Sequence, residues 1–228
     1  MSSETAKKPK KKTPRRHGPA ERPGPEGGKR AENRRRRLRA IERAGLELFL
    51  ERGVESVTID EIVGGAGIAK GSFYRYFRDK EDLVEAIMAP VAEGVTAALA
   101  KAEQVLDEAT TEAQQRAAYF ELAVALAQAF IANPDPVKLY LQEGRGPAVG
   151  ARRPLRQLAD RVMEQTVKLT RIAREHGLLR PFPARVSALA VIGATEQLTF
   201  RVLSGEDLGD LSKVPGDLIS LVMDGLRP

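Results

Sequence analysis

Residues 70–77 bring together the side-chain types that contact the bases and backbone of a DNA duplex. Arg75 can donate two hydrogen bonds to a guanine edge, Gly71 allows close approach of the backbone, and Tyr74 can reach a phosphate oxygen. At about 100° per residue of a helix, Arg75 lies nearly opposite Phe73, with Gly71 and Tyr74 around the same outer face. The pattern predicts a short helix whose outer face enters the major groove. An ordinary amphipathic helix with a solvated outer face is the alternative.

A preceding helix and a glycine turn are predicted to position this segment. Thr58 and Glu61 have the spacing of a capping box, in which each side chain bonds the backbone N–H of the other residue. Apolar residues then recur at helical spacing, at Ile59, Ile62, Val63 and Ala66. Gly67 can take the left-handed conformation that reverses the chain. Phe73 and Phe77 lie four residues apart and share a face that we expect to be buried. The sequence therefore predicts a helix-turn-helix at about residues 58–77.

The segment 38–88 closely resembles the DNA-binding domain of the TetR family of bacterial transcriptional regulators. The matching residues are Ile41, Ala44, Leu48, Phe49 and Gly53, then Val57-Thr58-Ile59, Ile62 through Ala66-Gly67-Ile68, Lys70-Gly71-Ser72-Phe73-Tyr74-Arg75-Tyr76-Phe77 and Lys80-Glu81-Asp82-Leu83. The resemblance implies phosphate contacts from Thr58, Ser72, Tyr74, Tyr76 and Lys80. Arg75, Lys70 and Gly71 are the residues we expect at the bases. The resemblance also implies that Arg34, Arg35, Arg36 and Arg37, just before the first helix, contact the DNA backbone or enter the minor groove.

The first part of the chain is strongly basic. Residues 1–39 hold fifteen Lys and Arg residues against four Glu residues, a net charge of +11, whereas the whole chain carries +6. The first 37 residues contain no Leu, Ile, Val, Phe, Tyr or Trp. Such a segment cannot bury enough apolar surface to offset its ordering entropy, so residues 1–33 are predicted to be a disordered basic tail. The tail either adds phosphate attraction to the neighbouring domain or is a solvated extension without consequence.

The sequence predicts an all-α protein, because the helix-forming residues Ala, Leu, Glu, Arg and Gln dominate its periodic segments. We expect a three-helix DNA-binding domain at 34–82, followed by a larger helical regulatory and dimerisation domain at 83–228. Its helices are predicted at 91–108, 111–132, 137–143, 153–176, 184–203 and from 214 onward. Pro90 is expected to kink or end the helix that Asp79 caps.

The last two helices are apolar on nearly every side, which predicts burial on every side. A second copy of the chain is the natural cover, and the resemblance implies that these two helices form a four-helix bundle in a homodimer. The predicted interface comprises Val191, Ile192, Leu198, Val202, Leu218 and Val222. A helix central to a monomeric core is the alternative.

A small apolar ligand is expected inside the 83–228 domain. Most aromatic residues outside the DNA-binding domain gather near the loop 144–150, and pockets combine apolar walls with a few polar groups. The predicted lining is Tyr119, Phe120, Phe130, Tyr140 and Arg145, with Gln197 as a polar anchor. The aromatic residues could instead fill the core, and the polar pair Glu196-Gln197 could bond within the chain or across a dimer.

The sequence offers no catalytic chemistry. It contains no cysteine, only two histidines, and no HExxH, Walker or nucleophile-elbow motif. We therefore predict no catalytic residue, no metal site and no cofactor. No uncharged apolar run reaches the length of a membrane span, so a cytoplasmic, nucleoid-associated protein is expected. The preferred function is a repressor released from a palindromic operator by a small molecule. An architectural, largely nonspecific DNA-binding protein and a small helical enzyme or lipid carrier are the alternatives.

Overall fold

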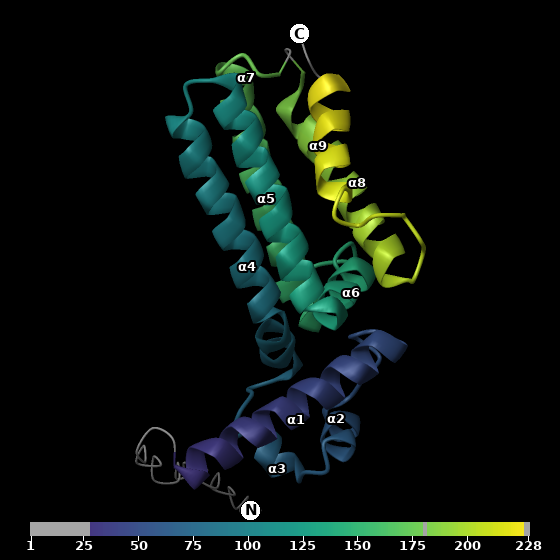
Figure 1. Ribbon diagram of the computed structural model, residues 1–228. Coiled ribbons are helices and arrows are strands. Elements are labelled where there is room, and N and C mark those ends of the chain that lie inside the picture. Colours follow the sequence, from purple (N-terminus) through teal and green to yellow (C-terminus); the bar gives the residue numbers. More distant parts are fainter. Residues whose placement is uncertain (1–27, 180–181, 226–228) are drawn as a thin grey trace, which may run out of the picture. The chain divides into compact units, whose positions relative to one another are not determined.

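The computed structural model describes residues 28–179 and 182–225, and every regular element among them is a helix (Figure 1). This confirms the all-α fold class. The chain divides between Arg37 and Leu38 into two compact units.

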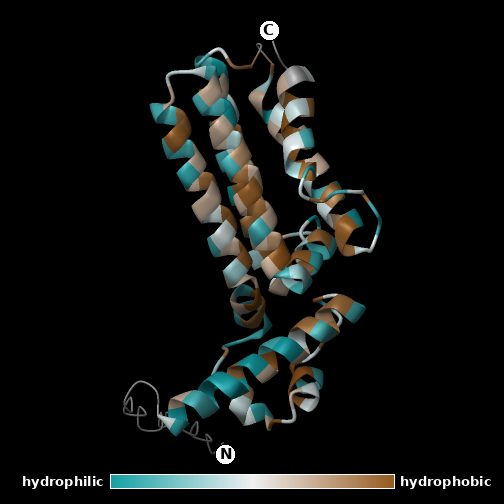
Figure 2. Cartoon of the chain, in the orientation of Figure 1, coloured by the Kyte–Doolittle hydropathy of each residue, from teal (hydrophilic) through white to brown (hydrophobic). Residues whose placement is uncertain are grey.

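Helix α1 spans Lys29–Arg52 and begins inside the segment that was predicted to be disordered. Residues 29–33 of the predicted tail are therefore helical, and residues 1–27 lie outside the described part of the chain. Lys29, Arg30 and Ala31 are strong helix formers, and Glu32 in the first turn complements the helix dipole. Figure 2 shows the early turns of α1 as hydrophilic, with hydrophobic residues further along the helix.

Two short helices follow, α2 at Ile59–Gly65 and α3 at Lys70–Phe73. Gly67 stands between them with φ at +64°, which confirms the predicted left-handed turn. The largest fully buried side chains of this part of the chain are Ile41, Phe49, Ile62, Phe73 and Leu83.

The remaining helices are α4 at Lys80–Glu108, α5 at Glu112–Ala132, α6 at Pro134–Glu143, the 3₁₀ turn η1 at Gly150–Arg152, α7 at Arg153–Glu175, α8 at Ala184–Leu203 and α9 at Val214–Gly225. Helix α4 packs against both α5 and α7, α8 packs on α7, and α9 packs on α5 (Figure 1). Asp79 caps α4, because its carboxylate accepts the N–H of Asp82 at 2.9 Å.

Pro90 does not end α4, which continues through it to Glu108. The proline stands on the exposed side of the helix. Water can therefore satisfy the carbonyl that loses its intrahelical partner.

Two of these helices, α4 and α8, are long and apolar enough to cross a membrane by length and composition alone, a test that core helices of soluble proteins also pass. The two differ in burial, since 44% of the apolar window of α4 is buried but only 11% of that of α8. Helix α4 is thus a core helix, whereas α8 leaves much apolar surface uncovered.

Candidate nucleic-acid interface and internal cavity

The recognition segment is anchored by two buried phenylalanines. Phe73 and Phe77 are both buried, and their ring centroids lie 5.6 Å apart. Helix α3 is regular only to Phe73, but the N–H of Phe77 still reaches the carbonyl of Phe73 at 3.0 Å. The helical turn therefore continues and keeps both rings on one face. The predicted burial of this pair is confirmed.

The opposite face of the segment is open. Tyr74 is 53% exposed, its ring packs edge-on against Phe73, and Gly71 and Arg75 are also exposed. Within the described residues, no ion pair holds the guanidinium of Arg75. The guanidinium of Arg75 is thus exposed on the side for which the sequence predicts DNA contact. Ser72 and Tyr76 are half-buried at the edges of this face.

Lys70 is exposed but already paired. Its ammonium lies 2.7 Å from a carboxylate oxygen of Asp60 on helix α2, and this hydrogen-bonded pair raises the pKa of Lys70. A base or phosphate contact from Lys70 therefore competes with Asp60, a residue that the sequence reasoning did not single out.

Thr58 starts helix α2 with the predicted capping box. The Glu61 N–H donates to the Thr58 hydroxyl at 3.3 Å, while the Thr58 N–H and hydroxyl donate to the Glu61 carboxylate at 2.8 and 2.7 Å. The Glu61 carboxylate also accepts from Arg52 at 2.7 Å. These bonds, that from the Thr58 backbone foremost, lower the pKa of Glu61 to about 2. A phosphate contact through the Thr58 hydroxyl would have to replace its bond to Glu61.

Lys80 has a structural partner that the sequence did not reveal. Its ammonium donates to the carbonyls of Val57 at 2.9 Å and Glu55 at 3.2 Å. These carbonyls lie in the connection between α1 and α2, so Lys80 ties the start of α4 to that connection. One of the three ammonium hydrogens is left for the predicted phosphate contact.

The four arginines Arg34, Arg35, Arg36 and Arg37 are all exposed and belong to helix α1 rather than to an extended arm. On a helix, consecutive side chains point around the axis, so the four cannot all face one groove. Their predicted contact with DNA stays a prediction.

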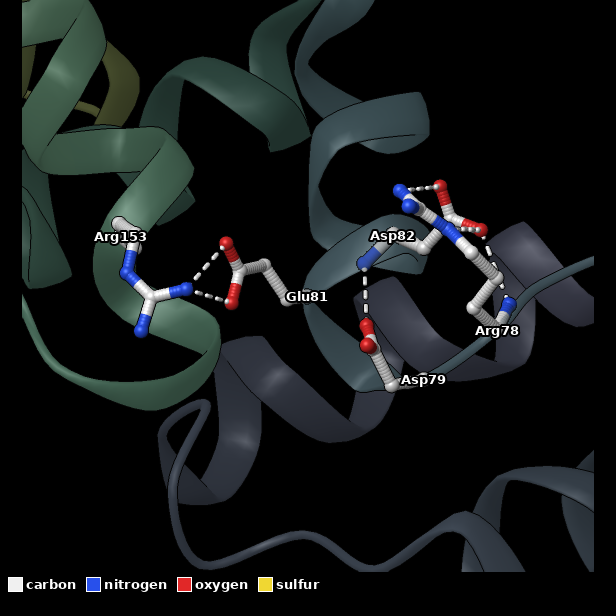
Figure 3. Close-up of polar contacts among 5 residues, drawn as sticks. All are labelled: Arg78, Asp79, Glu81, Asp82 and Arg153. Carbon is white, nitrogen blue, oxygen red and sulfur yellow. Dashed lines mark hydrogen bonds and ion pairs between the residues drawn. The ribbon is translucent and has the colours of Figure 1, made fainter.

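The start of α4 is fixed by a set of acidic residues (Figure 3). Asp82 accepts the backbone N–H of Arg78 at 2.9 Å and pairs with its guanidinium at 3.3 Å, which lowers the pKa of Asp82. Glu81 is held by Arg153, at the start of α7, with its two oxygens 2.8 and 2.6 Å from Nη1. Helix α7 is thereby joined to the first turn after the recognition segment.

A second polar contact joins helix α6 to the end of α1. The carboxylate of Glu143 accepts the backbone N–H of Val54 at 3.2 Å and pairs with Arg152. Glu143 is the last residue of α6, and Val54 follows the end of α1.

An apolar cavity of about 150 Å³, the inner cavity, lies among helices α4 to α8. It is lined by Val91, Val95, Leu99, Tyr119, Leu122, Leu126, Phe130, Val137, Tyr140, Leu141, Leu158, Val162, Thr166, Leu169, Val191, Ile192, Thr195, Glu196 and Thr199. Tyr119, Phe130 and Tyr140 thus line a cavity, and their contact with a ligand stays a prediction. Burial raises the pKa of Tyr119, whose hydroxyl donates to the carbonyl of Leu169 at 3.0 Å.

Two of the predicted lining residues lie elsewhere. Phe120 is exposed on α5, one position away from the inward-facing Tyr119. Gln197 is exposed as well, and its neighbour Glu196 takes the predicted place in the wall. Adjacent residues of a helix point about 100° apart, so only one residue of each pair can face the cavity. The polarity of Glu196 inside an apolar helix was the available signal.

Arg145 does not line the inner cavity, and its side chain is exposed. Its guanidinium pairs with Glu196 at 2.9 Å, and Glu196 also accepts the hydroxyl hydrogen of Tyr140 at 3.1 Å. Burial, together with the Glu196 carboxylate, raises the pKa of Tyr140. The three side chains form one hydrogen-bonded group between the inner cavity and the surface.

The predicted interface residues divide into two groups. Val191 and Ile192 line the inner cavity of the single chain, and their contact with a second copy stays a prediction. Leu198, Val202, Leu218 and Val222 are half-buried within one chain. Large apolar side chains that are openly exposed lie beside them on α8 and α9, at Val186, Leu189, Phe200 and Leu221. The position of a residue around the helix axis determines whether its side chain lines the cavity or is exposed. The apolar character of the residue does not by itself give this position.

Comparison with known proteins agrees with this architecture. The model of the bacterial regulatory proteins of the tetR family matches residues 41–87. The transcriptional regulator AcuR of Cereibacter sphaeroides is 58% identical over 40 residues, which are 18% of this chain and 18% of that protein. The repressor KstR2 of Mycolicibacterium smegmatis is 30% identical over 32% of this chain and 34% of its own length. The chain therefore matches less than two thirds of the length of either relative.

Two longer matches extend beyond the helix-turn-helix. The repressor BepR of Brucella suis is 26% identical over 82% of this chain and 90% of its own length. The fatty acid degradation regulator FadR from Bacillus halodurans shares the fold, with a TM-score of 0.62 and 18% identity over 83% of this chain and 99% of that one. Residues 41–87 therefore form a DNA-binding domain of the tetR family of bacterial regulatory proteins, and 83% of the chain shares its fold with FadR.

Proposed function

We propose that this protein is a repressor that binds a palindromic operator as a homodimer in the cytoplasm and is released from it by a small molecule. The observation that carries the DNA contact is the exposed face of Tyr74 and Arg75, fixed by the buried pair Phe73 and Phe77. A rigid support is what base recognition requires, because the guanidinium must meet a guanine edge with two aligned hydrogen bonds.

The apolar surface of α8 and α9 supports the homodimer. Leu189 and Phe200 on α8 and Leu221 on α9 are exposed in the single chain, and a second copy would cover them. A two-fold dimer presents two copies of α3, which accounts for recognition of two related half-sites.

The inner cavity supports a ligand, because an apolar space with a small polar group at its edge is typical of small-molecule sites. Its walls come from α4, which follows the recognition segment directly, and from α6 and α7, which contact the DNA-binding domain through Glu143 and Arg153. A ligand that prefers the arrangement with wrongly spaced recognition helices would release the DNA.

Selection of binding sites from random-sequence duplexes tests the proposal. We expect an enriched inverted repeat whose half-sites lie about one helical turn apart or slightly more, and protection of the same repeat in footprinting. Recovery of no common sequence, with binding that depends only on salt, would instead support the nonspecific architectural function.

A further inference from the structure

A second, more polar pocket adjoins the inner cavity. This outer pocket, of about 290 Å³, shares Tyr140, Leu141, Ile192 and Glu196 with the inner cavity. Its remaining lining includes Arg145, Arg156, Asp160 and Arg185. An apolar compartment therefore adjoins a charged one, and the group formed by Tyr140, Glu196 and Arg145 marks the boundary.

The charges of the outer pocket favour an anion. Three arginines face two carboxylates, of which Glu196 pairs with Arg145 at 2.9 Å and Asp160 pairs with Arg156 at 3.1 Å. Among the residues that the structure describes, no acidic group pairs with Arg185. Arg185 therefore gives the outer pocket one more positive than negative charge. The planar N–H donors of its guanidinium match the oxygens of a carboxylate or a phosphate. A cationic group entering here would meet three like charges.

Arg145 can bind an anion without abandoning Glu196. Only its Nη2 atom bonds to Glu196, and a guanidinium has five N–H donors. The Arg145 side chain is 75% exposed, so it can adjust, whereas Glu196 is only 19% exposed and is held by Tyr140. Glu196 therefore acts as a positioning residue that keeps Arg145 at the boundary.

We propose that the ligand of this protein is an anionic amphiphile whose apolar chain occupies the inner cavity and whose carboxylate or phosphate head binds Arg145 and Arg185 in the outer pocket. The inference rests on the proposed function for the assignment of the cavity to a releasing ligand. It can be measured on the full-length protein without DNA, so the two proposals can fail separately.

Calorimetric titration with four probes of one chain length tests the head group: octanoate, octyl phosphate, octanol and octyltrimethylammonium. At least one of the two anions should bind about tenfold more tightly than octanol, the factor expected of a charge-assisted hydrogen bond. Octyltrimethylammonium should bind most weakly. The two anions also distinguish a free carboxylate from a phosphate ester as the source of the head.

Two matched variants locate the head. Arg185→Gln should weaken binding of the preferred anion about tenfold and leave octanol binding unchanged. Arg171→Gln removes the same charge from an exposed position of α7 outside both pockets, so it should have little effect. Val162→Phe, which reduces the inner cavity, should weaken the binding of both the anion and octanol, with folding checked by circular dichroism.

The proposal is overturned if all four probes bind equally, if the cationic probe binds most tightly, or if Arg185→Gln behaves like Arg171→Gln. Should the anions bind as expected but leave an operator complex intact, the ligand class stands and the proposed release mechanism fails.

Discussion

Arg153 joins helix α7 to helix α4 by placing its Nη1 atom 2.8 and 2.6 Å from the two carboxylate oxygens of Glu81 (Figure 3). Helix α7 also contributes Leu158 and Val162 to the wall of the inner cavity. The pair therefore connects the helix that carries part of the cavity wall with the first turn after the recognition segment.

Glu81→Gln should reduce the effect of a ligand on operator affinity more than it reduces operator affinity itself. Allosteric coupling is typically worth about 1–3 kcal/mol, and a variant along the connection alters it by about 0.5–2 kcal/mol. The measurement is operator affinity with and without ligand. Glu121→Gln, which breaks the more exposed Lys101–Glu121 pair between α4 and α5, is the control. Equal coupling in the two variants would show that the Arg153–Glu81 pair does not transmit the signal.

Arg75→Ala should leave the fold intact and weaken operator binding, because Arg75 is exposed and unpaired within the described structure. A lost bidentate contact costs about 1–3 kcal/mol of base discrimination. Binding to duplexes with each base pair substituted in turn will show reduced preference at one position of each half-site. A uniform loss across all sequences would instead assign Arg75 to the phosphates.

Phe73→Ala should unfold the DNA-binding domain rather than alter its specificity. The side chain is fully buried against Phe77, so the cavity left behind costs about 3–5 kcal/mol. Urea unfolding followed by circular dichroism measures the loss, and Tyr74→Ala on the exposed face is the control. A stable Phe73→Ala protein with normal operator binding would contradict the assignment of faces.

Leu221→Glu should convert the proposed homodimer into monomers, because Leu221 is 73% exposed on the apolar surface of α9. Ile131→Glu is the matched control, since Ile131 is similarly exposed, at 75%, but belongs to α5 rather than to α8 or α9. Sedimentation equilibrium gives the mass of each variant. A dimeric Leu221→Glu protein, or a monomeric wild type, would remove the structural basis for palindromic recognition.

The capping box of α2 predicts a pH dependence of stability. The pKa of Glu61 is lowered from 4.5 to about 2 by the Thr58 backbone, Arg52 and the Thr58 hydroxyl, so the folded state binds this proton less tightly than the unfolded state. The contribution of Glu61 to stability is therefore complete above pH 4.5 and is lost as the pH falls from 4.5 to about 2. Glu61→Gln should show a flatter stability profile in this range, whereas Glu47→Gln, an exposed control on α1, should follow the wild type. Parallel profiles for Glu61→Gln and the wild type would mean that the Glu61 carboxylate contributes nothing to the pH dependence of stability.

The recognition segment follows from the sequence because its determinants are local. The cap formed by Thr58 and Glu61, the left-handed turn at Gly67 and the paired burial of Phe73 and Phe77 each depend on residues no more than four positions apart. Helical geometry alone fixes such relationships.

Only the tertiary structure shows the hydrogen-bond partners of Lys70 and Lys80. It also shows which residues line the cavity. Lys80 binds carbonyls 23 and 25 residues earlier in the chain, and Tyr140 meets Glu196 across 56 residues. Apolar spacing marks which helices must be buried, but the packing of one helix on another sets which side faces the cavity. For this reason Glu196 rather than Gln197 lines the cavity, and Val191 and Ile192 belong to the same wall.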